Sequence, residues 1–284
     1  MSRLRQDPGH FTVPRPIEVR HLFQPDRDAL LGLLRDLPDR DWSHPTACSG
    51  WDVHDVALHL LGGDLGNIAR RRDGVLRFQP GEHESLGAFL ERFNQDWVAA
   101  ARRFSPRLTI ELLRAAGPLM FSYFEGLDPT VMGGSVSWAG SGPAPVWLDL
   151  AREYMERWVH QQHIRDAVGR PGQHEASFLA PVVAASMHAL PVALAPHERP
   201  AGSAVSVRVT GDAGGMWTVV READRWQLLD GFTDGPGTAL VVAADDWWRL
   251  VTLGLDADAV GARARVDGEA VLAKAVLSAV AIIA

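Results

Sequence analysis

Residues 151–166, which read AREYMERWVHQQHIRD, are the stretch that decides the fold. The pattern predicts a helix, in which side chains three and four positions apart share one face. Glu156, His160 and His163 therefore lie on one helical stripe. A carboxylate and imidazoles arranged in this way can form half of a site for a divalent metal, and zinc suits them best. The alternative is an exposed stripe of charged side chains, and this helix alone does not decide between the two.

The remaining metal ligand must come from another segment, and His59 is the best candidate. It lies in a second predicted helix, capped by Asp52, among apolar residues at helical spacing: Val53, Val56, Leu60, Leu61, Leu65 and Ile68. A lone histidine on an apolar face is more often a core residue than a ligand. Metal sites in helix bundles are, however, built from inward side chains on facing helices, and three protein ligands leave a position open for catalysis. Gly62 and Gly63, which follow, either leave space for a ligand or allow a neighbouring helix to pack closely.

Composition narrows the class of protein. The 284 residues are 46% hydrophobic and 22% charged, with a net charge of -7 and one cysteine. The acidic balance argues against a nucleic-acid partner and against a polybasic membrane surface. We expect no membrane-spanning segment, because no apolar run approaches about 20 residues, and no signal peptide, so a cytoplasmic location is predicted. A single cysteine excludes a multi-cysteine zinc cluster, so we expect His, Asp and Glu to hold any metal.

The chain divides into a helical part and a mixed part. Helical patterns cover residues 25–37, 52–72, 85–97 and 106–125, with a kink expected at Pro118. A loop rich in Gly, Ser and Pro (132–145) precedes the quoted helix, and an apolar helical segment (175–195) follows it. Alternating patterns then predict strands near 205–209, 216–221, 226–229 and 238–243, followed by helices that start at Asp245 and Gly268. We therefore predict an α+β protein with a helix bundle at 1–196, a linker at 197–202 and a small α+β domain at 203–284.

Other catalytic signatures find little support. No HExxH motif is present, and Ser49 does not lie in a nucleophile-elbow pattern. Cys48 is better explained as a small buried residue than as a nucleophile. No glycine-rich phosphate loop occurs.

A resemblance to a known family rests on two separated motifs. The first is the run Trp42…Pro45-Thr46-Ala47-Cys48-Ser49-Gly50-Trp51-Asp52-Val53…Asp55-Val56…His59, and the second is Glu156-xxx-His160. Together they resemble the mycothiol-dependent maleylpyruvate isomerase family, whose N-terminal domain is a DinB-like four-helix bundle. The strand at 226–228, the helix at 245–253 and the turn at 266–269 are similar to the sterol-carrier-like domain of that family. The resemblance thus covers nearly the whole chain.

The resemblance implies a function and a ligand set. His59, Glu156 and His160 would be the zinc ligands, whereas His163 departs from many relatives, which carry an acidic residue there, and is left outside the set. Mycothiol would be the thiol cosubstrate of a cis-trans isomerisation of maleylpyruvate or a related enoic acid. An anionic substrate would need cationic partners, for which Arg157, Arg165, Arg208 and Arg221 are available. Arginines on helices and strands are, however, more often solvated than bound to a ligand.

Two alternatives remain open. A mycothiol S-transferase that acts on an electrophilic metabolite would use the same site and would keep the thiol in its product. A non-catalytic protein would instead bind a small ligand in the C-terminal domain. Trp247 and Trp248 could line a pocket there, although a place in the aromatic core explains the pair better. Under this second alternative we expect no bound metal at His59, Glu156 and His160.

Overall fold

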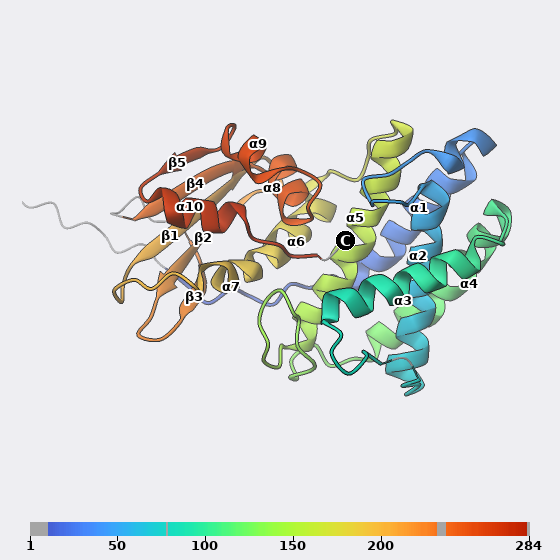
Figure 1. Ribbon diagram of the computed structural model, residues 1–284, viewed down its shortest axis with the longest axis horizontal. Coiled ribbons are helices and arrows are strands. Elements are labelled where there is room, and N and C mark those ends of the chain that lie inside the picture. Colours follow the sequence, from blue (N-terminus) through green and yellow to red (C-terminus); the bar gives the residue numbers. More distant parts are fainter. Residues whose placement is uncertain (1–10, 78, 232–236, 283–284) are drawn as a thin grey trace, which may run out of the picture. The chain divides into compact units, whose positions relative to one another are not determined.

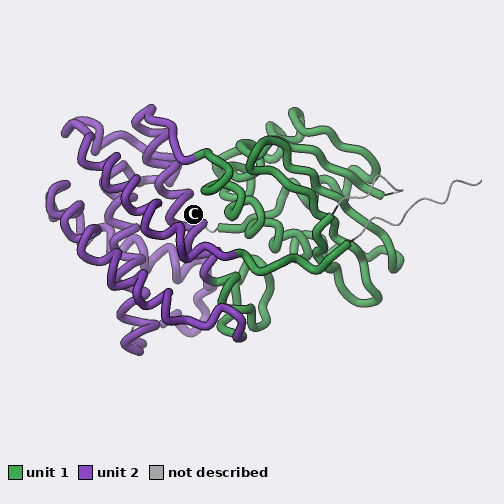
Figure 2. The backbone as a smooth tube through the Cα atoms, turned by 180° about the vertical axis from the view of Figure 1, so that it is seen from behind, with its two compact units in different colours: residues 1–17, 132–149, 174–284 green, residues 18–131, 150–173 purple. Residues whose placement is uncertain are grey.

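The computed structural model describes residues 11–77, 79–231 and 237–282 (Figure 1). Its contacts divide the chain into two compact units (Figure 2). The helical unit comprises residues 18–131 and 150–173, and the sheet unit comprises residues 1–17, 132–149 and 174–284. Helices together with a five-stranded sheet confirm the predicted α+β class.

The helical unit contains the predicted bundle. Its helices are α1 (Phe23–Arg35), α2 (Val53–Asn67), α3 (Leu86–Ala101), α4 (Pro106–Glu125) and most of α5 (Val146–Val168), with short turns η1 (Arg20–Leu22), η2 (Asp39–Ser43) and η3 (Ile68–Arg72). α4 packs against α1 and α2, and α3 packs along α2. The buried core combines apolar side chains of α1, α2, α4 and α5, among them Leu30, Leu34, Val56, Leu61, Leu113 and Ile164. Four helices thus share one core.

Local chemistry fixes the start of α2. Asp52 accepts a hydrogen bond from the Asp55 backbone N–H, and the Asp55 carboxylate accepts one from the Asp52 N–H, which together form a capping box. Further along α2, a Cβ atom at Gly62 would lie 2.4 Å from the Trp97 ring of α3, whereas one at Gly63 would meet nothing within 4 Å. Close packing of a neighbouring helix therefore explains Gly62.

The sheet unit has the strand order β3-β2-β1-β4-β5. Its strands are β1 (Ala204–Thr210), β2 (Gly215–Arg221), β3 (Trp226–Asp230), β4 (Thr238–Ala243) and β5 (Arg265–Asp267). β1 and β4 pair in parallel, and the other neighbours are antiparallel. The four predicted strands are confirmed, while the sequence indicated only a turn at the short strand β5. Helices α8 (Ala244–Val251), α9 (Ala257–Gly261) and α10 (Ala270–Leu277) complete this part of the unit.

The apolar segment before the sheet packs with the sheet. It forms α6 (Ala176–Ser186), η4 (Met187–Ala189) and α7 (Leu190–Leu194), and its contacts with α8, α10 and β3 place it in the sheet unit. The domain limits 1–196 and 203–284 stay a prediction, and the contact-based units divide the chain elsewhere.

The same segment, Ala176–Leu194, is long and apolar enough to cross a membrane, so the expectation that no apolar run approaches this length was wrong. Half of it, 50%, is buried within the structure, and a buried core helix passes the same test of length and composition.

The two tryptophans considered as a pocket wall lie in the core of the sheet unit. Trp247 and Trp248 are 0% and 1% exposed, and Trp247 Nε1 donates to Ser186 Oγ of α6 at 2.8 Å. A buried indole N–H with a hydrogen-bond partner is the usual state of a core tryptophan. These contacts favour a core role for the pair.

Candidate metal centre

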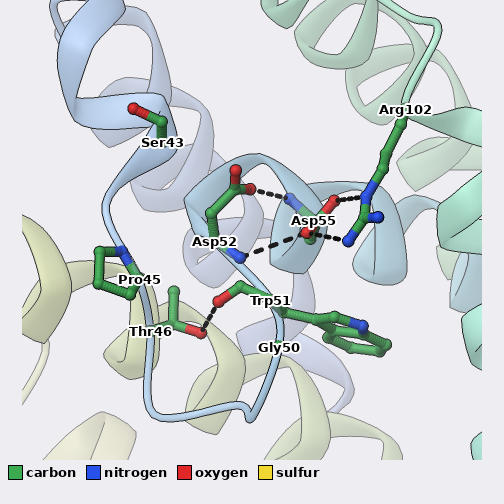
Figure 3. A pocket seen from close by; sticks show the side chains of 8 residues that line it. All are labelled: Ser43, Pro45, Thr46, Gly50, Trp51, Asp52, Asp55 and Arg102. Atoms are coloured by element: carbon green, nitrogen blue, oxygen red, sulfur yellow. Dashed lines mark hydrogen bonds and ion pairs between the residues drawn. The ribbon is translucent and has the colours of Figure 1, made fainter.

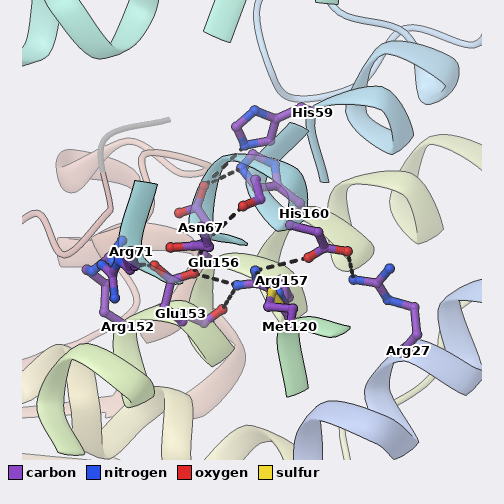
Figure 4. Close-up of polar contacts among 12 residues, drawn as sticks. Arg27, His59, Asn67, Arg71, Met120, Arg152, Glu153, Glu156, Arg157 and His160 are labelled. Atoms are coloured by element: carbon purple, nitrogen blue, oxygen red, sulfur yellow. Dashed lines mark hydrogen bonds and ion pairs between the residues drawn. The ribbon is translucent and has the colours of Figure 1, made fainter. Parts of the chain in front are cut away.

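The three residues predicted as metal ligands meet inside the helical unit. Glu156 Oε1 lies 3.2 Å from His59 Nε2 on α2 and 3.2 Å from His160 Nε2 on α5 (Figure 4). His59 and His160 are buried, whereas the Glu156 side chain keeps 27% of its surface exposed. The helical spacing of Glu156 and His160 on α5 and the position of His59 on α2 therefore bring three donor atoms together at a place that solvent can reach.

The spacing of these atoms fits a divalent cation. Tetrahedral zinc with Zn–N distances of about 2.0–2.1 Å requires its ligand atoms to be roughly 3.3 Å apart. Both Glu156–histidine distances, 3.2 Å, come close to this value, and all three atoms lie within 4.8 Å of one another. Two imidazoles and a carboxylate are also the donor set of several catalytic zinc sites.

The protonation equilibria of the cluster are strongly coupled. Burial raises the pKa of Glu156, but the charge and hydrogen bonds of His160 and His59 outweigh it and hold the pKa well below its usual range. Burial lowers the pKa of His160, but Glu156 and a contact with Cys48 raise it to about 10. For His59 burial prevails, and its pKa is lowered. In the cation-free protein the pairing of charges is therefore Glu156⁻ with His160⁺, beside a neutral His59.

A second group of donor atoms adjoins the first. Cys48 Sγ lies 3.1 Å from His163 Nδ1 and 3.6 Å from His160 Nδ1, and all three side chains are buried. Burial raises the pKa of the Cys48 thiol, but the two histidines outweigh it and lower the pKa to about 6. The sequence indicated correctly that Cys48 is buried, but the expectation that only His, Asp and Glu can hold a metal overlooked this group. Cys48 lies 112 and 115 positions before its two partners in the sequence, so no local signal indicated the pairing.

Comparison with known protein families matches residues 23–165, half of the chain, to the mycothiol maleylpyruvate isomerase N-terminal domain. The chain belongs to this family. The matched region runs from α1 into α5 and contains His59, Glu156 and His160 as well as Cys48 and His163. The resemblance deduced from the sequence motifs is therefore confirmed.

Solved structures of mycothiol-dependent maleylpyruvate isomerase share the fold. Two crystal structures, one of them of a histidine mutant, are 9% and 8% identical in sequence to this chain, with a TM-score of 0.51 for each. Each match covers 84% of this chain and 89% of the other. Among curated proteins no match is found.

In this member of the mycothiol maleylpyruvate isomerase family, buried ion pairs lie directly beside the site. Arg157 donates to Glu153 Oε2 at 2.7 Å and to Asp64 Oδ1 at 3.1 Å, and Arg27 donates to Asp64 Oδ2 at 2.6 Å (Figure 4). Because Arg157 is 5% exposed and already binds two carboxylates, it is unsuited to the role of substrate partner considered above. Arg165 is likewise engaged, since it donates to Gln161 Oε1 at 3.2 Å and to a backbone carbonyl. The pairs fix the rotation of α5 and so the direction in which Glu156 and His160 point.

Trp51 connects the site of this family member to a surface hollow. Its ring lies 5.0 Å from the His59 ring, and its Nε1 donates to Gln95 Oε1 at 2.9 Å. The hollow, about 310 Å³, is lined by Ser43, Pro45, Thr46, Gly50, Trp51, Asp52, Asp55 and Arg102 (Figure 3). Arg102 and Asp55 form a two-pronged ion pair there, with both distances 2.8 Å. Trp51 therefore packs against the His59 ring and also lines this hollow.

Proposed function

We propose that this chain is a zinc-dependent enzyme that uses mycothiol to isomerise maleylpyruvate or a related cis-enoic acid. The meeting of His59 Nε2, Glu156 Oε1 and His160 Nε2 carries the proposal. Family membership supports an enzyme that depends on mycothiol, and the solved relatives are named for maleylpyruvate isomerisation.

His59, Glu156 and His160 would hold the cation. Three protein ligands leave a coordination position open, which is the arrangement of catalytic rather than structural zinc. When bound, the cation would lower the pKa of a thiol at that position and polarise a substrate carbonyl.

The side chains prepare the site for the cation and the substrate. The lowered pKa of His59 keeps its imidazole neutral near pH 7, so a ring nitrogen lone pair is available. His160, whose pKa is about 10, must release a proton when it becomes a ligand. Glu156 supplies a negative charge, and the 27% exposure of its side chain leaves the site open to small molecules.

The proposed reaction conserves electrons and returns the thiol. The thiolate sulfur forms a bond to an alkene carbon, and the π electron pair moves into the enolate of the conjugated carbonyl. The former double bond is then single and rotates. The enolate electron pair re-forms the double bond as the C–S bond breaks, which releases the trans acid and the thiolate.

Proton NMR of maleylpyruvate with zinc-loaded protein and mycothiol tests this proposal. We expect cis-to-trans conversion that requires catalytic amounts of thiol, with the thiol recovered unchanged. His59→Ala, Glu156→Gln and His160→Ala are expected to abolish conversion. His54→Ala is the matched control, because His54 also lies on α2 but contacts Thr109 Oγ1 at 3.0 Å instead of the site.

The outcomes separate the competing functions. Stoichiometric loss of thiol into a stable thioether would contradict isomerisation and support an S-transferase. Conversion that persists in all three variants would remove the proposed site from the reaction. Failure of the loaded wild type with maleylpyruvate and with related cis-enoic acids would overturn the isomerase proposal.

A further inference from the structure

The Cys48 group has the composition of a cation site of its own. Cys48 Sγ, His160 Nδ1 and His163 Nδ1 all lie within 4.8 Å of one another, and the three side chains are 8%, 2% and 3% exposed. One sulfur and two imidazole nitrogens form a softer donor set than the carboxylate-containing group beside it. Such sets favour thiophilic cations, including Zn²⁺ and Cu⁺.

The distances agree with coordination. A zinc ion with Zn–S of about 2.3 Å and Zn–N of about 2.0–2.1 Å holds its sulfur and nitrogen ligands roughly 3.6 Å apart in a tetrahedron. The structure has 3.6 Å from Cys48 Sγ to His160 Nδ1 and 3.1 Å to His163 Nδ1. A cation at this point would therefore need only a small outward movement of His163.

The backbone around Cys48 holds the sulfur in place. The Cys48 N–H donates to Thr46 Oγ1 at 3.2 Å, and the Trp51 N–H donates to the Cys48 carbonyl at 3.0 Å. Thr46 Oγ1 in turn donates to the Trp51 carbonyl at 2.9 Å. The loop is thus cross-linked on both sides of the cysteine, and a preformed ligand costs less to order on binding.

His163 gains little from its surroundings without a ligand. Its Nδ1 faces only sulfur, a weak hydrogen-bond partner, and within the described residues its buried Nε2 has no partner. Burial of a polar group with so few hydrogen bonds is costly, and coordination would offset that cost.

We propose that Cys48, His160 and His163 form a second cation site, which selects thiophilic cations such as Zn²⁺ and its spectroscopic substitute Co²⁺. His160 belongs to both sites: its Nε2 faces Glu156 and its Nδ1 faces Cys48. A neutral imidazole has one lone pair on its ring nitrogens, so the two sites compete for this residue. The chain then binds one such cation at a time, at either site.

Cobalt titration of the full chain, in the absence of added thiols, tests this site. A thiolate ligand gives Co²⁺ a near-ultraviolet charge-transfer band, and Cys48 is the one cysteine in the sequence, so the band has a single source. His59→Ala and Glu156→Gln disable the first site and leave all three donors of the second. We expect the band in both variants, at one equivalent of Co²⁺, and its loss when Cys48→Ser is added.

A second measurement guards against misfolding and separates this proposal from the proposed function. X-ray absorption of zinc-loaded His59→Ala and Glu156→Gln, each checked by circular dichroism, should show a sulfur atom at about 2.3 Å from zinc. His163→Asn in the same backgrounds should weaken Co²⁺ binding at least about tenfold, whereas His54→Asn should leave it unchanged. Absence of both the charge-transfer band and the sulfur atom from the folded variants would overturn the second site. The single variant Cys48→Ser keeps His59, Glu156 and His160, so its binding of Co²⁺ tests the first site whatever the result for the second.

Discussion

Asp26 gives a quantitative prediction for the helical unit. Its side chain is 3% exposed, and Oδ1 accepts a hydrogen bond at 2.9 Å from Nε2 of Gln161, the residue that follows His160 in the sequence. Burial raises the pKa of Asp26 to about 7, because nearby arginines and the Gln161 hydrogen bond offset only part of the desolvation. The native state thus keeps a proton that the unfolded chain loses near pH 4.

The sign and size of the pH effect follow from this difference. Below pH 4 both states hold the proton and Asp26 costs nothing. Between pH 4 and 7 the native state binds more protons, so the free energy of unfolding falls as pH rises, by about 1.4 kcal/mol per unit. The maximal cost above pH 7 is on the order of 4 kcal/mol, and from pH 5 to 8 the loss is about 3 kcal/mol.

Asp26→Asn should remove this dependence and keep the hydrogen bond from Gln161. Urea denaturation at pH 5, 6, 7 and 8 should show a stability gain over wild type that grows by about 3 kcal/mol across the series. Asp28→Asn, an exposed substitution on the same helix, is the control and should stay within about 0.5 kcal/mol of wild type. A gain for Asp26→Asn that does not change with pH would refute the reasoning.

Three other outcomes follow from the packing and charges. Gly62→Ala places a methyl group 2.4 Å from the Trp97 ring and should lower the free energy of unfolding in urea by about 1–3 kcal/mol. Gly63→Ala, whose methyl group would meet nothing within 4 Å, should raise it by up to about 1 kcal/mol. Equal effects of the two substitutions would contradict the packing of α3 against Gly62. Arg157→Met removes one buried arginine partner from Glu153 and from Asp64, whose other arginine partners remain, and should cost on the order of 3 kcal/mol; a loss below about 1 kcal/mol would show that the ion pairs of Arg157 are not intact. Chelation of the metal should lower the melting temperature of wild type and leave that of a His59→Ala, Cys48→Ser double variant unchanged, because a ligand that binds only the native state stabilises it.

Local patterns in the sequence predicted most of the fold because short-range rules decide it. Asp52 was expected to cap α2, and the capping box confirms it. Alternating valines predicted β1, and helical spacing placed Glu156 and His160 on one face of α5. At three residues, β5 was too short to show an alternating pattern.

Long-range pairings could not be predicted, because no local rule connects their partners. The contact of Cys48 with His163 depends on how a loop before α2 meets α5, and the burial of Arg157 depends on Asp64 of another helix. Gly62 and Gly63 look alike in the sequence, and only the position of α3 separates them. His59 was predicted as a ligand through family resemblance, since its apolar surroundings alone favoured a core role.

The central claim is that this chain holds a divalent cation at His59, Glu156 and His160. Elemental analysis of protein purified with zinc supplied tests it most directly. Four proteins are compared: the wild type, Cys48→Ser alone, and two double variants in which Cys48→Ser is combined with His59→Ala or with Glu156→Gln. The account predicts one metal ion per chain in the wild type and in Cys48→Ser, and less than a tenth of that in both double variants. A wild type without metal, or double variants that retain it in full, would contradict the account.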